Sequence, residues 1–188
     1  MHHQKPQPPI KQIKWRGGGR APHAMARGAT AVNGNVAYFV SWSGRTHSYD
    51  SSIQRWRELP KCPHEGISLV VIQGVLTAIG GHTGYYDTDK LLSIINDQDK
   101  RWIDHFPSMP TKQMNTIAVT TKQHLIVAGG ESGPKPGESG PKFPDTVEVM
   151  DVESLLWSTA ARLRIPHPYS KASAAICMWR SPVHTGRK

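Results

Sequence analysis

Residues 68–81 read SLVVIQGVLTAIGG, and this stretch decides the fold class. The apolar, β-branched run at 68–72 predicts a strand that is buried on both faces. Gln73 and Gly74 then turn the chain, and residues 75–79 predict a second strand that stops at a double glycine. The stretch is therefore expected to form an antiparallel hairpin.

Two further strands extend this hairpin into a unit of four. The apolar run 91–95 follows a polar loop and predicts a third strand, and residues 102–106 predict a fourth. Prolines at 107 and 110 end the unit, because proline cannot donate a hydrogen bond to a neighbouring strand. We expect four short antiparallel strands between residues 68 and 110.

The same order of features recurs on both sides of this unit. The following unit has expected strands at 116–119, 125–128, 146–151 and from Trp157 to near Pro166, with Gly129 and Gly130 after the second. The preceding unit has expected strands at 29–32, 35–40, 48–50 and 56–60, with the hairpin signal Asn33-Gly34 after the first. It lacks the double glycine and has Ser41-Trp42-Ser43-Gly44 at that place.

Tryptophans mark the period of this repeat. Trp15, Trp56, Trp102 and Trp157 lie 41, 46 and 55 residues apart. Periods of about 40–50 residues that each hold several strands are typical of propeller blades. Each tryptophan offers a large apolar plate that can pack between neighbouring blades.

These landmarks resemble the kelch repeat, in which an apolar strand, Gly-Gly, a strand ending in Asp, a Trp and a proline-terminated strand follow one another. The residues that carry the resemblance are Gly80, Gly81 and Trp102; Gly129, Gly130, Asp151 and Trp157; and Asp50 and Trp56. The resemblance implies an all-β, kelch-type β-propeller arc of about three four-stranded antiparallel blades plus flanking strands. The repeat region is too short for the six or seven blades of a complete ring.

The repeats set the expected domain boundaries. Residues 1–14 are expected to be a basic, disordered segment, residues 15–178 the repeats, and residues 179–188 an off-pattern basic tail. Within the repeats, the expected blade units are 28–63, 66–110 and 115–166, with partial flanking strands at 15–24 and 170–178. An open arc leaves strand edges and blade faces uncovered, which favours self-association.

Charge and cysteine content limit the classes of partner and compartment. The net charge of +9 lies entirely in residues 1–28 and in the last nine residues, while residues 29–177 carry 14 basic and 14 acidic side chains. Nucleic-acid binding is therefore not expected of the folded body. Cys62 and Cys177 form no disulfide framework, and no apolar run is long enough to span a membrane, so we expect a cytoplasmic protein.

No catalytic or metal-binding motif accompanies the repeats. The ten histidines form neither an HExxH motif nor a zinc-spaced cluster with cysteine, and no GxSxG motif is present. Copper radical oxidases resemble kelch propellers in fold, but Cys62 and Cys177 do not suggest their ligand set and are expected to be buried thiols. We expect no catalytic residue, metal or cofactor.

The loops between strands are the expected interaction surface, since the resemblance implies that they line one face of the propeller. The candidates for contact with a partner are Arg27, Arg45, His64, His82, Tyr85, Tyr86, Lys112, Asn115, His167 and Tyr169. Tyrosine and arginine are enriched at interface hot spots, and the pair Tyr85-Tyr86 is the strongest local candidate.

The expected function is a non-enzymatic protein-interaction module for a protein or peptide partner. The resemblance implies a role like that of the substrate-recognition domain of ubiquitin-ligase adaptors. The first alternative is an incomplete kelch gene product without independent function, and the second is an enzyme like the copper oxidases.

Overall fold

The computed structural model describes residues 19–25, 27–84, 87–95, 98–134 and 139–163. These residues form three four-stranded antiparallel sheets and no helix. Blade 1 contains β1 (Ala29–Asn33), β2 (Val36–Val40), β3 (Thr46–Asp50) and β4 (Arg55–Leu59). Blade 2 contains β5 (Ser68–Ile72), β6 (Val75–Ile79), β7 (Leu91–Ile94) and β8 (Ile103–Phe106). Blade 3 contains β9 (Ile117–Thr120), β10 (His124–Ala128), β11 (Thr146–Asp151) and β12 (Trp157–Arg162).

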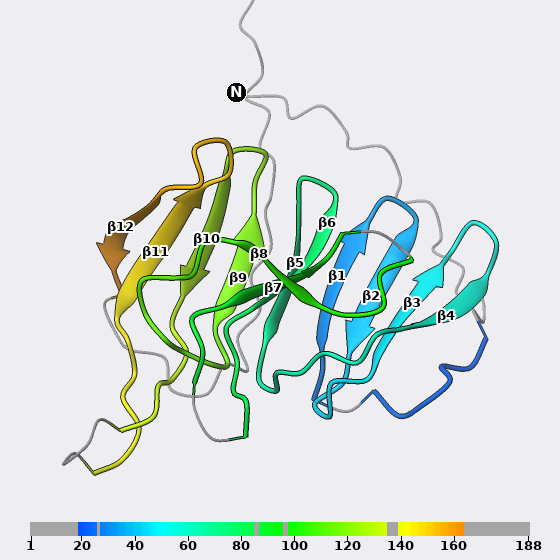
Figure 1. Ribbon diagram of the computed structural model, residues 1–188, viewed down its shortest axis with the longest axis horizontal. Helices are drawn as coiled ribbons and strands as arrows, with labels where there is room; N and C mark the ends of the chain where they lie inside the picture. The colour runs from blue at the N-terminus through cyan, green and yellow to red at the C-terminus, as the bar shows by residue number, and fades with distance from the viewer. Residues whose placement is uncertain (1–18, 26, 85–86, 96–97, 135–138, 164–188) are drawn as a thin grey trace, which may run out of the picture.

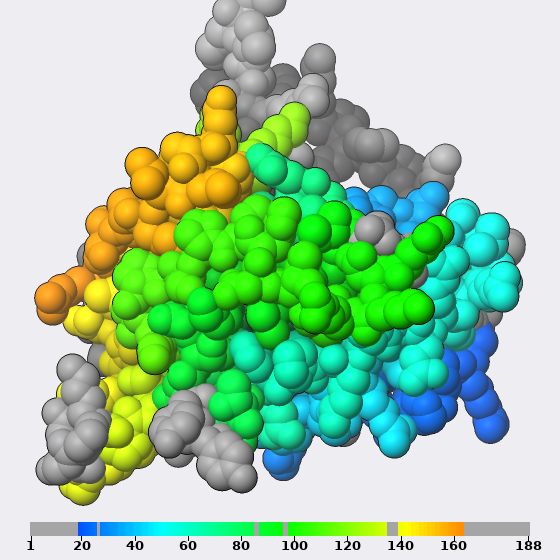
Figure 2. All heavy atoms as spheres, in the orientation of Figure 1, coloured from blue at the N-terminus to red at the C-terminus, as the bar shows by residue number. Residues whose placement is uncertain are grey.

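The three sheets are arranged as propeller-like blades. In each blade the strands pair in chain order, and β5 lies beside both β1 and β9, so the first strands of the blades are neighbours. Figure 1 shows β4 and β12 at opposite ends of the molecule, with the first strands between them. Blade 2, in green, lies between blades 1 and 3 in the space-filling view of Figure 2. The described blades form an arc and do not close into a ring.

All twelve strands expected within the three units are present, with small shifts at their ends. The third strand of blade 1 begins two residues earlier than expected, at Thr46, because residues 46–50 pair in full with β2. Trp102 precedes β8 instead of opening it, and β12 ends at Arg162 before the expected Pro166. In the expected flanking segment 15–24, residues 19–24 contain no strand, and residues 15–18 lie outside the described part.

The double glycines permit a bend that other residues would obstruct. Gly80 and Gly81 have φ angles of +64° and +102°, and Gly129 and Gly130 have φ angles of +65° and +95°. A Cβ atom on Gly81 would lie 2.6 Å from the carbonyl oxygen of Glu65. The bend therefore favours residues without a Cβ atom at these positions.

Carboxylates stabilise the turns after the third strands. Asp50 Oδ1 accepts the backbone N–H of Ser52 at 2.8 Å, and Asp151 Oδ1 accepts that of Ser154 at 2.7 Å. Hydrogen bonds from Ser52 and Ser154, side-chain and backbone, hold the pKa of the two carboxyls below the ordinary aspartate value. The two aspartates therefore stabilise the corresponding turns of blades 1 and 3 in the same way.

Apolar clusters join each blade to the next. The cluster between blades 1 and 2 contains Val40, Leu59, Cys62, Leu69, Leu76, Ala78, Ile94 and Trp102. The cluster between blades 2 and 3 contains Val70, Ile72, Ile79, Leu91, Phe106, Met109, Leu125, Val127, Met150 and Val152, with Trp157 packed against it. Burying one such large aliphatic side chain is worth about 1.5–3 kcal/mol, so these clusters dominate the stability of the arc.

Tryptophans also make a polar contact across each of these boundaries. The indole N–H of Trp102 donates to the carbonyl oxygen of Pro60 over 2.9 Å. The indole N–H of Trp157 donates to the carbonyl oxygen of Pro107 over 3.1 Å. In both cases the acceptor directly follows the fourth strand of the preceding blade, which confirms that these tryptophans pack between blades.

Glu148 is a buried carboxylate in β11, only 2% exposed. Its Oε1 accepts the hydroxyl of Thr111, while its Oε2 has no hydrogen-bond partner among the described residues. Burial raises the pKa of this carboxyl above the ordinary value of 4.5.

We expect Glu148→Gln to raise the melting temperature at pH 7. Because the pKa is raised in the folded state, stability falls as pH rises from 4.5 through the folded pKa, and the charged carboxylate is disfavoured above it. The amide removes this charge and should give a gain of a few degrees, at about 2–4 °C per kcal/mol. The gain in melting temperature should vanish at pH 4, where the Glu148 carboxyl is neutral. The control Glu153→Gln changes an exposed carboxylate and should give no gain at either pH. An equal gain at pH 4 and pH 7 would contradict a raised pKa of Glu148.

The expectation of buried thiols is confirmed for one of the two cysteines, and the other is not described. Cys62 is buried, as expected, and burial raises its pKa to about 11. Cys177 lies outside the described residues. Nowhere in the described part does a helix have the length and apolar character needed to cross a membrane.

Candidate functional site

The residue two positions before the first strand has a left-handed backbone in every described blade. Arg27, Gly66 and Asn115 have φ angles of +51°, +62° and +53°. The backbone N–H of Asn115 donates to the carbonyl oxygen of Gly66 over 2.7 Å, which ties blade 3 to blade 2 at this level. Positive φ is uncommon for a residue with a Cβ atom, and such residues concentrate at functional sites. The backbone at this level of the molecule is therefore of the kind found at functional sites.

A pocket of about 570 Å³ opens at this level, and all three blades line it. Its lining residues are Arg27, Gly28, Ala29, Val40, Ser41 and Trp42 of blade 1, Gly66 and Ile67 of blade 2, and Asn115 and Glu131 of blade 3. Volumes of about 300–1,000 Å³ are typical of ligand-binding sites.

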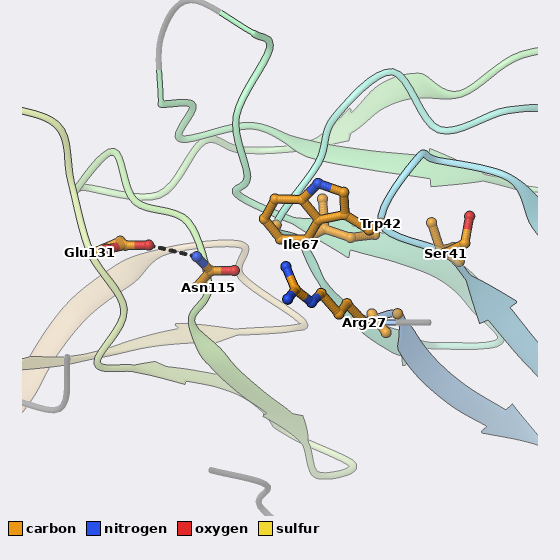
Figure 3. Close-up of a pocket in the computed structure, with 10 residues that line it drawn as sticks. Arg27, Ser41, Trp42, Ile67, Asn115 and Glu131 are labelled. Atoms are coloured by element: carbon orange, nitrogen blue, oxygen red, sulfur yellow. Dashed lines mark hydrogen bonds between the residues drawn. The ribbon is translucent and has the colours of Figure 1, made fainter. Parts of the chain in front are cut away.

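Arg27 and Trp42 supply the accessible groups of the pocket. Both side chains are exposed, and Trp42 is one of the exposed large apolar residues of the described chain, at 42%. Figure 3 shows the guanidinium group of Arg27 pointing into the pocket, between the indole of Trp42 and the amide of Asn115. A guanidinium and an indole together offer hydrogen-bond donors, positive charge and a flat apolar surface to a ligand.

Asn115 and Glu131 form the polar wall opposite Trp42. The side-chain amide of Asn115 donates to Oε1 of Glu131 over 2.7 Å, as the dashed line in Figure 3 shows. Glu131 is buried, and its backbone exchanges hydrogen bonds of 2.8 and 3.0 Å with Met114. These contacts fix the Asn115 side chain, so its amide oxygen is held in place to accept a hydrogen bond.

The described residues that line the pocket supply groups suited to binding. The only hydroxyl in the lining, that of Ser41, lies 3.1 Å from the hydroxyl of Ser43 and accepts the backbone N–H of Arg45. No histidine or cysteine lines the pocket. Across the described residues, no three His, Cys, Asp or Glu side chains are grouped so that they could hold a metal ion.

Of the six predicted contact residues that lie in the described part of the chain, two line this pocket, namely Arg27 and Asn115. Arg45 and Lys112 are exposed but are not among its lining residues. His82 is half-buried, and its Nδ1 accepts the backbone N–H of Gly84 over 3.0 Å. Tyr85, Tyr86, His167 and Tyr169 lie outside the described residues.

His64 differs most from the expectation of an exposed loop residue. It is only 8% exposed, and its Nδ1 lies 3.3 Å from the carbonyl oxygen of Gly80. Burial lowers the pKa of its imidazole below the ordinary value of 6.5. Because the side chain packs beneath the double-glycine bend, it presents little surface to a partner.

Sequence reasoning missed Trp42 and Glu131 as pocket residues. When the strands are aligned, Trp42 occupies the position of Gly81 and Gly130, the second residue after the second strand. A tryptophan at a position that is glycine in both other units is the signal that could have identified it. Glu131 directly follows the double glycine of blade 3, where blade 2 has His82.

Comparison with known proteins adds no family assignment. No protein-family model matches the chain, and the search of curated proteins found no match.

Proposed function

We propose that this chain is a non-enzymatic protein-interaction module that binds a peptide segment of its partner. The observation that supports the proposal is the pocket formed by all three blades, in which Arg27 and Trp42 are accessible and Asn115 is fixed by Glu131. Arginine and tryptophan are enriched among the residues that dominate binding energy at protein interfaces.

We further propose that the arc is of the kelch type. Support comes from Gly80-Gly81 and Gly129-Gly130 after the second strands, Asp50 and Asp151 after the third, and Trp102 and Trp157 between the blades. The resemblance then makes the recognition domain of ubiquitin-ligase adaptors the nearest functional analogy. That analogy rests on fold, whereas the binding role rests on the pocket.

The pocket favours a bound segment that is apolar at one position and accepts hydrogen bonds at another. The exposed indole of Trp42 and the side chain of Ile67 provide an apolar surface, and Arg27 provides a cation with several N–H donors. An extended peptide can present both kinds of group within a few residues, because successive side chains point to opposite sides.

A displayed library of random peptides, selected on the immobilised chain, tests this proposal. Peptides that bind in the pocket should lose at least about 30-fold in affinity with Arg27→Ala or Trp42→Ala, the effect of a hot spot worth about 2 kcal/mol. Arg55→Ala is the matched control, since Arg55 is also exposed on blade 1 but does not line the pocket. Selected peptides that bind all three variants equally would contradict the proposed site.

A further inference from the structure

Trp56 has the same position in blade 1 as the two tryptophans that join the blades. It lies in β4, the fourth strand, as Trp157 lies in β12 and Trp102 directly before β8. Its indole nitrogen is buried, yet it has no hydrogen-bond partner among the described residues. A buried donor without an acceptor is costly, so such a group in a native protein calls for an explanation.

The side chains around Trp56 belong to the face of blade 1 that is turned away from blade 2. Val40 and Leu59 pack toward blade 2, and neighbouring residues of a strand point to opposite sides of the sheet. We therefore define the outer face of blade 1 by Val32, Phe39, Tyr49 and Trp56. Ring centroids of Phe39 and Tyr49 lie 5.3 and 5.0 Å from that of Trp56, which makes this face aromatic.

Equivalent positions in the other blades are covered by the preceding blade. Val71, the fourth residue of β5, packs against the cluster between blades 1 and 2. Val32 is the fourth residue of β1 and is 66% exposed. Ala78, the fourth residue of β6, is buried, whereas Phe39, the fourth residue of β2, is only half-buried. The outer face of blade 1 thus has the composition of a blade interface without the preceding blade.

Blade 3 has the complementary surface. Leu125, Val127 and Met150 pack toward blade 2, so Ile126 and Val149 point to the opposite side. We define the outer face of blade 3 by Val119, Ile126, Val149 and Ser158, the last being paired with Val149. The three apolar residues are half-buried and belong to neither inter-blade cluster.

We propose that two copies of this chain associate head to tail, with the outer face of blade 3 in each copy covering the outer face of blade 1 in the other. Leu163 directly follows β12, as Pro60 follows β4 and Pro107 follows β8. In this contact Leu163 of the second copy takes the place beside blade 1 that Pro60 takes beside Trp102 and Pro107 beside Trp157.

The number of copies follows from the number of blades. Contacts between unlike surfaces produce closed rings when the rotation per copy returns to the start. Propellers contain about 4–8 blades, so the three described blades of one copy are too few for a ring, and the nine of three copies would be too many. Two copies with three described blades each give a ring of six and leave neither outer face uncovered.

Size-exclusion chromatography with light scattering tests the proposal on the full chain. The unchanged protein should have a mass of twice 20.8 kDa. Val32→Arg and Ser158→Arg should each shift the mass toward 20.8 kDa. The pair has two equivalent contacts between the chains, and each substitution places a positive charge in both of them. Thermal melting of each variant checks that it is folded, as expected for two exposed positions.

Ile53→Arg is the matched control. Ile53 is 65% exposed, close to the 66% of Val32, but it lines a small pocket with Tyr38 and Ser48 on the side of blade 1 that faces blade 2. This variant should keep the mass of two chains. Mixing Val32→Arg with Ser158→Arg leaves one of the two contacts without a substitution, while the other contact carries both arginines. The mixture should therefore form more complexes of two chains than either variant alone, but fewer than the unchanged protein.

Three results would overturn the proposal. The first is a single-chain mass for the unchanged protein, which would leave Trp56 to be covered by residues 1–18 or by another protein. The second is disruption by only one of the two interface variants. The third is a mixture that stays at 20.8 kDa at the highest concentration reached, which would exclude head-to-tail pairing.

Discussion

Trp102→Ala is expected to lower the free energy of unfolding by about 3–5 kcal/mol, the range for truncating a buried aromatic side chain. Trp102 is 7% exposed and belongs to the cluster between blades 1 and 2. Its indole N–H also donates to the carbonyl oxygen of Pro60, so the substitution removes apolar contacts and a hydrogen bond together. Urea denaturation followed by circular dichroism measures the loss.

Two variants separate the contributions to this effect. Trp102→Phe keeps most of the ring and removes only the donor, so it should cost about 1 kcal/mol for the hydrogen bond, plus the loss of a few ring atoms. Trp42→Ala truncates an exposed tryptophan and should change stability by no more than about 0.5–1 kcal/mol. If Trp102→Ala cost no more than Trp42→Ala, the indole would not be what joins blades 1 and 2.

Gly81→Ala is expected to be destabilising by about 3–5 kcal/mol, because two penalties add. The φ angle of +102° is unfavourable for any residue with a Cβ atom, at a cost of about 1–3 kcal/mol. In addition, the new Cβ would lie 2.6 Å from the carbonyl oxygen of Glu65 and 2.8 Å from Cγ2 of Ile67. The backbone of Glu65 cannot yield easily, since it exchanges two hydrogen bonds with His82.

Gly74→Ala measures the cost of the unfavourable φ alone, so the difference between the two variants gives the steric part. Gly74 lies in the same blade with a φ angle of +84°, but a Cβ at this position would have no neighbour within 4 Å. It should therefore cost only about 1–2 kcal/mol for the unfavourable φ. Equal losses for the two variants, measured by the same urea titration, would show that close approach at the double glycine contributes nothing.

The fold could be predicted because its determinants are local in the sequence. Each strand is a short apolar or alternating run, and Asn33-Gly34 and Gln73-Gly74 mark turns whose positive φ angles the structure contains. The ends of the strands were predicted less accurately. Thr46 and His47 are polar, but both are buried in β3, because pairing with Val40 and Phe39 determines where that strand begins.

The pocket could be predicted only in part, because residues far apart in the sequence form it. Arg27 and Asn115 were expected as contact residues from their places before the first strands, and both line the pocket. Glu131 was missed, since its importance comes from the hydrogen bond that it accepts from Asn115 across 16 positions of the chain. His64 was expected at the surface, but its ring is buried. It packs beneath the double-glycine bend, with Nδ1 3.3 Å from the carbonyl oxygen of Gly80.

The tryptophan contacts also determine how stability is distributed along the arc. Each described contact couples one blade to its immediate neighbour, as in a one-dimensional chain of repeats. Blade 2 is bounded by an apolar cluster on each side, whereas blades 1 and 3 each share only one. In a single copy, local unfolding therefore starts at blades 1 and 3. Blade 2, which contains β5 to β8, unfolds last because it is packed on both sides.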